Sequence, residues 1–397
     1  MMDIERIRAD TPATGRRAYL HNAGAALMPR QVVAAIKNHI DLEAEIGGYA
    51  AFRREIERCE AVYGSVARLL KAQPQEIALV ENATVAWQMA FYSLNFAPGD
   101  RILTAEAEYA ANYVAFLQMA KRTGAVIDVV PSDKTGELDT QALQRMIDGK
   151  VKLIAVTWVP TNGGLTNPAA TIGRIAKANG IPYLLDACQA VGQMQVDVGE
   201  LRCDMLSATG RKFLRGPRGT GFLYVREGFL DRMEPPVIDH YAAPWVARDR
   251  YELRPDARRF ENWENSYAAR LGLGAAIDYA LDIGMDAIEA RCRALSDRLR
   301  EGLAALAGVA VLDLGRSPSA IVSFNVEGAD ARDVTRAALA AGITIGASEP
   351  ESTRIDSENR NLADTVRASP HYYNTEAEVD RLIELCREMC RSHSQRK

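Results

Sequence analysis

Several features that often reveal a protein's surroundings are missing from this sequence. No run of eighteen apolar residues occurs in the 397-residue chain, so no membrane-spanning helix is predicted. Positive charge is not in excess, because the formal net charge is -4, and this disfavours nucleic acid or an anionic membrane as a partner. The N-terminal stretch MMDIERIRAD lacks the apolar core of a signal peptide. These absences predict a soluble, cytoplasmic protein that binds neither membranes nor nucleic acid.

Cysteine is scarce, and its spacing excludes two common uses. The six cysteines include no CxxC pair and match no disulfide framework. Cys386 and Cys390 lie four residues apart on a predicted helix, but no cluster of His or Cys supplies the further ligands that a metal ion would need. We therefore interpret the cysteines as small buried side chains in a reducing compartment, and we predict no metal site.

Apolar residues make up 48% of the chain, and its length suits two domains of ordinary size. Short apolar runs alternate with amphipathic runs in the middle of the sequence, where helices are predicted at 84–94, 111–123 and 170–180. Strands are predicted at 76–80, 100–106, 126–131, 151–159, 181–187, 205–209 and 221–225. Continuous apolar strands that alternate with helices predict an α/β fold with a mainly parallel sheet flanked by helices.

The last third of the chain has a different pattern. A long helical stretch is predicted from about Tyr267 to Leu306, followed by strands at 310–314 and 320–326 and by helices at 331–342 and 375–391. This order predicts a smaller α+β domain. The predicted organisation is an N-terminal segment over 1–20, a large domain over 21–264 and a small C-terminal domain over 265–397.

Candidate functional residues are those that follow the predicted strands, because open α/β sheets bind ligands beyond the carboxyl ends of their strands. Asn82, Ala83 and Thr84 follow the first strand and begin a helix. A hydroxyl group and free N–H groups at a helix N-terminus suit an anion such as phosphate. An ordinary helix cap is the alternative interpretation.

A second candidate follows the strand at 181–187, where Asp186 is followed one helical turn later by Gln189. A carboxylate at the end of a buried strand needs a partner, and a protonated ring nitrogen would be a good one. A capping Asp is one alternative. A ribose-binding Asp is another, although no GxGxxG motif begins a helix after an early strand.

A third candidate is Lys212, in the glycine-bounded basic segment GRKFLRGPRG at 210–219. A solvated basic loop is the usual interpretation of such a run. Lys212, however, lies between a predicted buried strand and the apolar pair Phe213-Leu214. A desolvated lysine beside other cations has a lowered pKa and becomes a usable amine nucleophile. A phosphate-type helix start, an aromatic residue, a strand-end Asp and this Lys are together what a pyridoxal phosphate (PLP) site needs.

Three longer motifs carry a resemblance to a known family: DACQAVGQ at 186–193, SATGRKFLRGPRGTGFLYV at 207–225 and VRASPHYYNTEAEVDRL at 366–382. With these motifs the chain resembles the class V aminotransferase family of fold-type I PLP enzymes, from about Tyr19 to the last helix. That family includes cysteine desulfurases, isopenicillin N epimerase-like proteins and ergothioneine-pathway C–S lyases. The resemblance implies a large PLP-binding domain, a small amino-acid substrate and a homodimer.

The resemblance also implies roles for single residues. Lys212 would hold PLP as a Schiff base and move protons at the substrate, Asp186 would pair with the ring nitrogen, and Gln189 would bind the ring's phenolic oxygen. Tyr109 would stack on the ring, and Arg367 would bind the substrate carboxylate. The phosphate would be bound by Ala83, Thr84, Thr209 and Arg211, and the substrate pocket would also include Asn112 and His21.

The sequence departs from the desulfurase pattern at several positions. The segment 342–361, where desulfurases carry their persulfide cysteine, contains no cysteine. Arg211 and Tyr109 replace histidines, Thr161 replaces an asparagine near the ring, and Glu264 replaces a threonine that reaches the neighbouring subunit's phosphate. We therefore expect a C–S lyase that acts by β-elimination on cysteine, a cysteine S-conjugate or its sulfoxide. The alternatives are an aminotransferase or an epimerase, and a persulfide mechanism is disfavoured.

Overall fold

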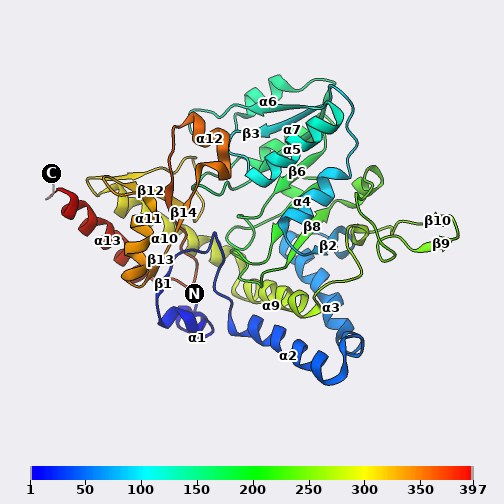
Figure 1. Cartoon of the computed structure of the whole chain (residues 1–397), viewed down its shortest axis with the longest axis horizontal. Coiled ribbons are helices and arrows are strands. Elements are labelled where there is room, and N and C mark those ends of the chain that lie inside the picture. Colours follow the sequence, from blue (N-terminus) through cyan, green and yellow to red (C-terminus); the bar gives the residue numbers. More distant parts are fainter. Residues whose placement is uncertain (1, 395–397) are drawn as a thin grey trace.

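The computed structural model describes residues 2–394, and its centre is a seven-stranded sheet (Figure 1). The strand order is β2-β8-β7-β6-β5-β3-β4. Neighbours from β7 to β4 are parallel, whereas β8 is antiparallel to both β2 and β7. The strands are β2 (Ile77–Val80), β3 (Arg101–Ala105), β4 (Val126–Val130), β5 (Val151–Thr157), β6 (Tyr183–Asp186), β7 (Met205–Thr209) and β8 (Gly221–Val225).

Both faces of this sheet are buried, which explains why its central strands are apolar throughout. On β6, Leu185 packs in one hydrophobic cluster and Leu184 in another on the opposite face. The prediction of an α/β fold with a mainly parallel sheet is confirmed. The connecting helices are α4 (Ala83–Tyr92), α5 (Ala110–Thr123), α6 (Thr140–Met146), α7 (Ala169–Ala178) and α8 (Val198–Leu201).

Two long helices that we did not predict precede the sheet, and α9 (Tyr267–Ile283) packs against both of them. They are α2 (Arg30–Ile46) and α3 (Gly48–Leu70), which follow the short helix α1 (Ile4–Ala9). The helical stretch predicted from about Tyr267 to Leu306 consists of two helices, because α9 ends at Ile283 and α10 (Met285–Ala304) begins after Gly284. Gly284 has φ +95° and ψ +121°, a backbone conformation that residues other than glycine rarely adopt.

The C-terminal part of the chain forms a second, four-stranded antiparallel sheet in the order β11-β12-β15-β14. Its strands are β11 (Val309–Val311), β12 (Val322–Val326), β14 (Gly346–Ser348) and β15 (Thr365–Ala368), and its helices are α11 (Ala331–Ala340), α12 (Arg354–Asn359) and α13 (Glu376–Ser394). The N-terminal strand β1 (Ala18–Tyr19) pairs with β13 (Ile343–Thr344), so the start of the chain joins this region. The predicted domain boundaries at 20 and 264 stay predictions.

A hairpin of β9 (Trp245–Ala247) and β10 (Arg250–Tyr251) projects from the side of the molecule opposite the C-terminus (Figure 1). Trp245 on this hairpin is 74% exposed. In the described part of the chain, no helix is long and apolar enough to cross a membrane. Short 3-10 turns occur at Pro12–Gly15, Pro74–Glu76, Glu227–Arg232, Ala257–Phe260 and Pro350–Thr353.

Candidate active site

A cavity of about 410 Å³ lies at the carboxyl ends of β5, β6 and β7, where the strand rule predicts a ligand site. Nine of the eleven residues that the sequence indicated for cofactor or substrate binding line this cavity, and Arg367 and His21 do not. The lining comprises Asn82, Ala83, Thr84, Val85, Tyr109, Asn112, Thr157, Val159, Thr161, Asp186, Cys188, Gln189, Thr209, Arg211 and Lys212.

The last residue of β6 places a carboxylate on the cavity wall. Asp186 is 5% exposed and accepts hydrogen bonds from Asn112 Nδ2 at 2.9 Å and from the Cys188 backbone N–H at 2.9 Å. Burial raises the pKa of Asp186, and these hydrogen bonds together with the charge of Lys212 oppose the increase. A positively charged partner inside the cavity would stabilise this carboxylate.

Lys212 follows β7 on a tight turn. The turn is closed by hydrogen bonds from Gly216 N to Gly210 O at 2.8 Å and from Arg215 N to the Lys212 carbonyl at 2.9 Å. Lys212 is only 8% exposed, and the thiol of Cys188 forms a hydrogen bond with it. The amine of Lys212 is therefore buried near the thiol of Cys188 and the carboxylate of Asp186. It forms no ion pair in the described chain, so it is available to a ligand in the cavity.

The lining of the cavity also includes groups that suit an anion. Asn82 caps α4 by accepting a hydrogen bond from Val85 N at 3.0 Å, and the N–H groups of Ala83 and Thr84, which belong to the first turn, have no carbonyl partner within the helix. Thr84, Thr209 and Arg211 line the same cavity. The guanidinium of Arg211 also donates a hydrogen bond to the carbonyl of Gly24. Hydroxyl groups, helix N–H groups and a guanidinium form a suitable donor set for phosphate.

A second cavity of about 260 Å³ adjoins the first one, and both are lined by Tyr109, Thr161, Arg211 and Lys212. Arg367, on β15, lines only this second cavity and is 8% exposed. Its Nη1 donates to the Thr161 carbonyl at 2.8 Å and to Thr161 Oγ1 at 2.6 Å, while its buried Nε has no partner. Burial and the charge of Arg211 lower the pKa of Arg367 to about 10. A buried guanidinium with an unpartnered Nε and no acidic partner is well suited to bind a carboxylate.

Two residues predicted to bind substrate are engaged in contacts within the protein. The ring of His21 packs between Gly24 and Gly346 and lines neither cavity. Burial, with smaller effects from Arg367 and Arg211, lowers the pKa of His21 to about 4. Asn112 lines the first cavity, but its amide donates to Asp186 and to Glu108. A substrate-binding role for these two residues stays a prediction.

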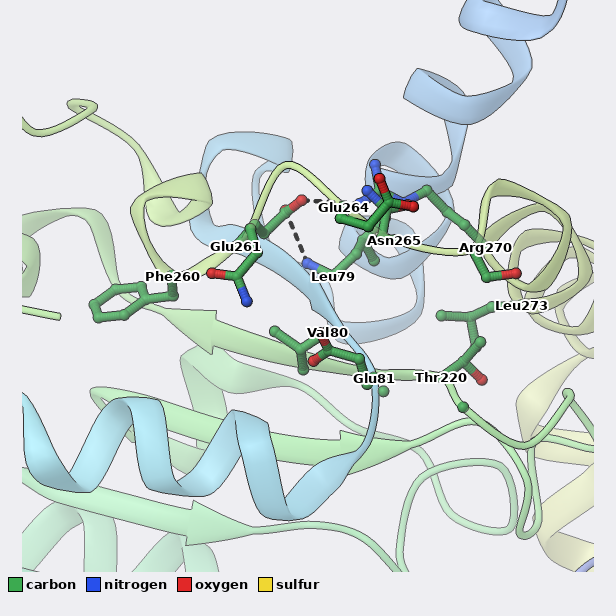
Figure 2. A pocket seen from close by; sticks show the side chains of 14 residues that line it. Leu79, Val80, Glu81, Thr220, Phe260, Glu261, Glu264, Asn265, Arg270 and Leu273 are labelled. Carbon is green, nitrogen blue, oxygen red and sulfur yellow. Dashed lines mark hydrogen bonds and ion pairs between the residues drawn. The ribbon is translucent and has the colours of Figure 1, made fainter. Parts of the chain in front are cut away.

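Glu264 lies outside both cavities. It lines a smaller pocket with Val80, Glu81 and Thr220, which Figure 2 shows. Glu261, which also lines this pocket, accepts hydrogen bonds from Leu79 N at 2.9 Å and from Tyr63 Oη at 2.8 Å, and it forms an ion pair of 3.0 Å with Arg270. Glu261 and Arg270 are both buried. The ion pair joins Glu261 to α9, and the hydrogen bond from Leu79 joins it to β2.

Sequence reasoning missed Glu108, which lies between β3 and α5 and is 3% exposed. Its carboxyl group binds Asn112, which in turn binds Asp186. Burial raises the pKa of Glu108 to about 7, although hydrogen bonds from Thr157 and Asn112 oppose the increase and Asp186 adds to it. The rule that singled out Asp186 at the end of a strand would also have identified Glu108, three residues after β3.

The unsatisfied groups of the two cavities match PLP. In the described chain, no carboxylate forms an ion pair with Lys212, Arg211 or Arg367, and the buried Oε1 of Gln189 has no hydrogen-bond partner. An amine for the aldehyde, a carboxylate for the ring nitrogen and donors for the phosphate occur together. The fold and the cavity therefore define a PLP-dependent enzyme of fold type I.

Comparison with known proteins identifies the family. The model of the Aminotransferase class-V family matches residues 18–382, and the chain belongs to this family. A cysteine desulfurase of Yersinia pestis bv. Antiqua (strain Angola) is 34% identical, with 96% of each chain covered. The solved apo cysteine desulfurase of Thermococcus onnurineus NA1 is 29% identical, with a TM-score of 0.91 and 99% of each chain covered. A solved C-DES mutant with glycine linked covalently to its PLP cofactor is 21% identical, covers 96% of this chain and 98% of its own, and with a TM-score of 0.87 shares the fold.

These comparisons correct one expectation from the sequence. The C–S lyase that we expected from the cysteine-free segment 342–361 is contradicted, because relatives at about 30% identity over nearly the whole chain are cysteine desulfurases. The error has a physical cause. A missing side chain at one position excludes one sulfur acceptor, but it does not decide what happens at the carbon–sulfur bond.

Proposed function

We propose that this PLP-dependent enzyme removes sulfur from L-cysteine and releases alanine, with a thiol from solution as the sulfur acceptor. In this reaction the substrate carbon–sulfur bond breaks and a sulfur–sulfur bond forms. Cysteine and a thiol RSH become alanine and the persulfide RSSH, so no oxidant or reductant is needed. The observation that carries the proposal is that Lys212 borders both cavities, one suited to PLP and one containing Arg367.

We propose the following positions for the cofactor. Lys212 holds its aldehyde, Asp186 pairs with its ring nitrogen and Gln189 forms a hydrogen bond with its phenolic oxygen. Tyr109 stacks on the ring, and the phosphate is bound by Ala83 N–H, Thr84, Thr209 and Arg211. The unpaired cations that line the cavity, Arg211 and Lys212, support these assignments. PLP, when bound, withdraws electrons from the substrate carbon next to the amino group.

The side chains of this protein then have three tasks at the substrate. Arg367 binds the carboxylate with its Nε and its remaining amino group, while Thr161 fixes the other side of the guanidinium. Lys212 accepts the proton of the substrate α-carbon and later returns a proton. Asp186 keeps a negative charge beside the ring nitrogen, which favours the protonated ring.

The acceptor thiol is assigned to solution for a geometric reason. Among the described residues, Cys188 is the one cysteine that lines either cavity. It lies beside Asp186 and Lys212 in the first cavity and does not line the cavity that contains Arg367. A thiol there would face the cofactor ring and not the substrate sulfur.

The cysteine-free segment 342–361 favours transamination as a second candidate. Transamination needs a carboxylate-binding arginine and a lysine that moves protons, but it needs no thiol at all. The keto acid product and the dependence on an amino acceptor distinguish it from sulfur removal.

The test is to incubate the purified enzyme with L-cysteine, with and without dithiothreitol, and to measure alanine, sulfide and pyruvate. Alanine and sulfide in equal amounts, formed only with the added thiol, are expected. A product that is mainly pyruvate would refute the proposal. A single conversion of the cofactor, with turnover only after a keto acid is added, would establish the transaminase instead. The variant Lys212→Ala is the control and should form no product.

We also propose that the enzyme is a cytoplasmic homodimer. All six cysteines are free, as expected in a reducing compartment. The projecting hairpin exposes Trp245 and Tyr251, at 74% and 48%, which favours contact with a second copy of the chain. Light scattering at two protein concentrations measures the mass and tests the dimer.

A further inference from the structure

Glu108 is a buried carboxyl group that has no contact with the cofactor or the substrate in the proposed site. It is 3% exposed, and no cation forms an ion pair with it in the described structure. It does not line either cavity, in contrast to Asp186. Burying a carboxyl group without a cation is unfavourable, so its hydrogen bonds must compensate.

Five hydrogen bonds converge on this carboxyl group. Oε1 accepts from Tyr109 N at 3.0 Å, from Asn112 Nδ2 at 2.8 Å and from the Thr157 hydroxyl. Oε2 accepts from Thr157 N at 2.9 Å and from Thr104 Oγ1 at 3.1 Å. The donors come from β3, β5 and the start of α5, so the group joins three elements at the edge of the cavity.

Two of these donors continue to groups that line the cofactor cavity. The amide nitrogen of Asn112 also donates to Asp186 at 2.9 Å, so its two hydrogens bridge two buried carboxyl groups. The backbone N–H of Tyr109 is fixed by Glu108, and the ring of Tyr109 lines both cavities. One carboxyl group thus holds the backbone of the aromatic residue and the orientation of the Asn112 amide.

We propose that Glu108 is a positioning residue for the cofactor, which aligns Asp186 through Asn112 and the Tyr109 ring through the Tyr109 backbone. This inference rests on the proposed contacts of Asp186 and Tyr109 with the cofactor ring. A merely structural Glu108 would stabilise the fold without affecting the orientation of the bound ring. The two roles therefore differ in what happens to the cofactor when the fold is intact.

The experiment compares Glu108→Gln, Asn112→Ala and the double variant. Glutamine keeps the shape of the side chain but has one acceptor oxygen, so at least one N–H donor loses its partner. Three quantities are measured: the dissociation constant of PLP from the stripped protein, the visible circular dichroism of the bound cofactor, and the unfolding midpoint of the stripped protein. Glu106→Gln, in the same connection but partly exposed, is the matched control.

Each single variant should weaken PLP binding by about tenfold and reduce the visible circular dichroism, because the ring is held less firmly. The double variant should bind PLP somewhat more weakly than either single variant, but by less than the product of the two losses, because both changes break the route through Asn112 and only Glu108→Gln also loosens the Tyr109 backbone. Losses that multiply in the double variant would overturn the inference. An unchanged affinity and dichroism in Glu108→Gln would also overturn it.

Two further variants keep the test decisive. If Glu108→Gln does not fold, Thr104→Val removes only the hydroxyl donor to Oε2, outside the cavity, and decides by the same two readouts. Asp186→Asn tests the assignment on which the inference rests. If Asp186→Asn leaves affinity and dichroism unchanged, the proposed site fails. If it changes both and the Glu108 variant changes neither, only the role of Glu108 fails.

Discussion

Replacing Arg367 should weaken substrate binding without lowering the free energy of unfolding. The guanidinium is buried without an acidic partner, and its pKa of about 10 lies below the ordinary value of 12.5 because of burial and the nearby Arg211. This difference corresponds to about 3 kcal/mol that disfavours the charged form in the folded protein. The pKa is lowered in the folded state, so the penalty is fully present below pH 10 and declines between pH 10 and 12.5.

The variant Arg367→Met removes this charge, together with two hydrogen bonds to Thr161 worth about 1 kcal/mol each. The substrate-free protein should therefore be as stable as the parent or about 1 kcal/mol more stable in denaturant titrations. KM for the amino acid should rise by about 100-fold or more, since charge-assisted hydrogen bonds to the carboxylate are worth about 1.5–3 kcal/mol each. Arg367→Lys, which keeps the charge but not the fork, should show an intermediate KM.

The reasoning fails if Arg367→Met lowers the free energy of unfolding by about 3 kcal/mol, as the truncation of a core residue does. The guanidinium would then be a structural part of the fold. It also fails if KM stays at the parent value while kcat alone decreases.

Three other changes test separate features. Glu261→Leu should reduce the free energy of unfolding by about 3–5 kcal/mol, because Arg270 is left buried and unpaired. Glu264→Leu, at an exposed position nearby, is the control and should change the free energy of unfolding by about 0.5 kcal/mol or less. Urea titration measures both variants. Gly284→Ala should cost about 1 kcal/mol or more, because φ of +95° is strained for alanine, and a loss below this in the same titration would contradict that account. Trp245→Ser should shift the monomer–dimer equilibrium toward monomer in light scattering, and an unchanged mass at every concentration would exclude the hairpin from the interface.

The sequence predicted the parallel core well because its signal is local. The strands ending at Asp186 and preceding Lys212 are short, mainly apolar runs that are buried throughout, and their ends mark the cavity. The break at Gly284 was missed because both flanking helices have helical periodicity, and a single glycine does not by itself end a helix. Whether Gly284 adopts a positive φ depends on how α9 and α10 pack, which is a property of the folded chain.

The parts of the site that escaped prediction depend on contacts between distant residues. His21 follows a strand-like segment, but its ring fills the space between Gly24 and Gly346, a packing that no local pattern encodes. Glu108 follows the end of a predicted strand, so the strand-end rule could have indicated its position. Its burial and its five hydrogen bonds depend on the way β3, β5 and α5 meet, which its neighbours in the sequence do not encode.

The candidate site draws its parts from two different sheets. Asp186 and Thr209 end strands of the seven-stranded sheet and Lys212 follows one of them, whereas Arg367 lies on β15 of the four-stranded sheet. Under the proposed assignments, the residues that bind the cofactor and the residue that binds the substrate carboxylate belong to separate stretches of the chain. Substitutions in the four-stranded sheet are then expected to weaken substrate binding while the cofactor stays bound, and a small rotation between the sheets would alter substrate affinity first.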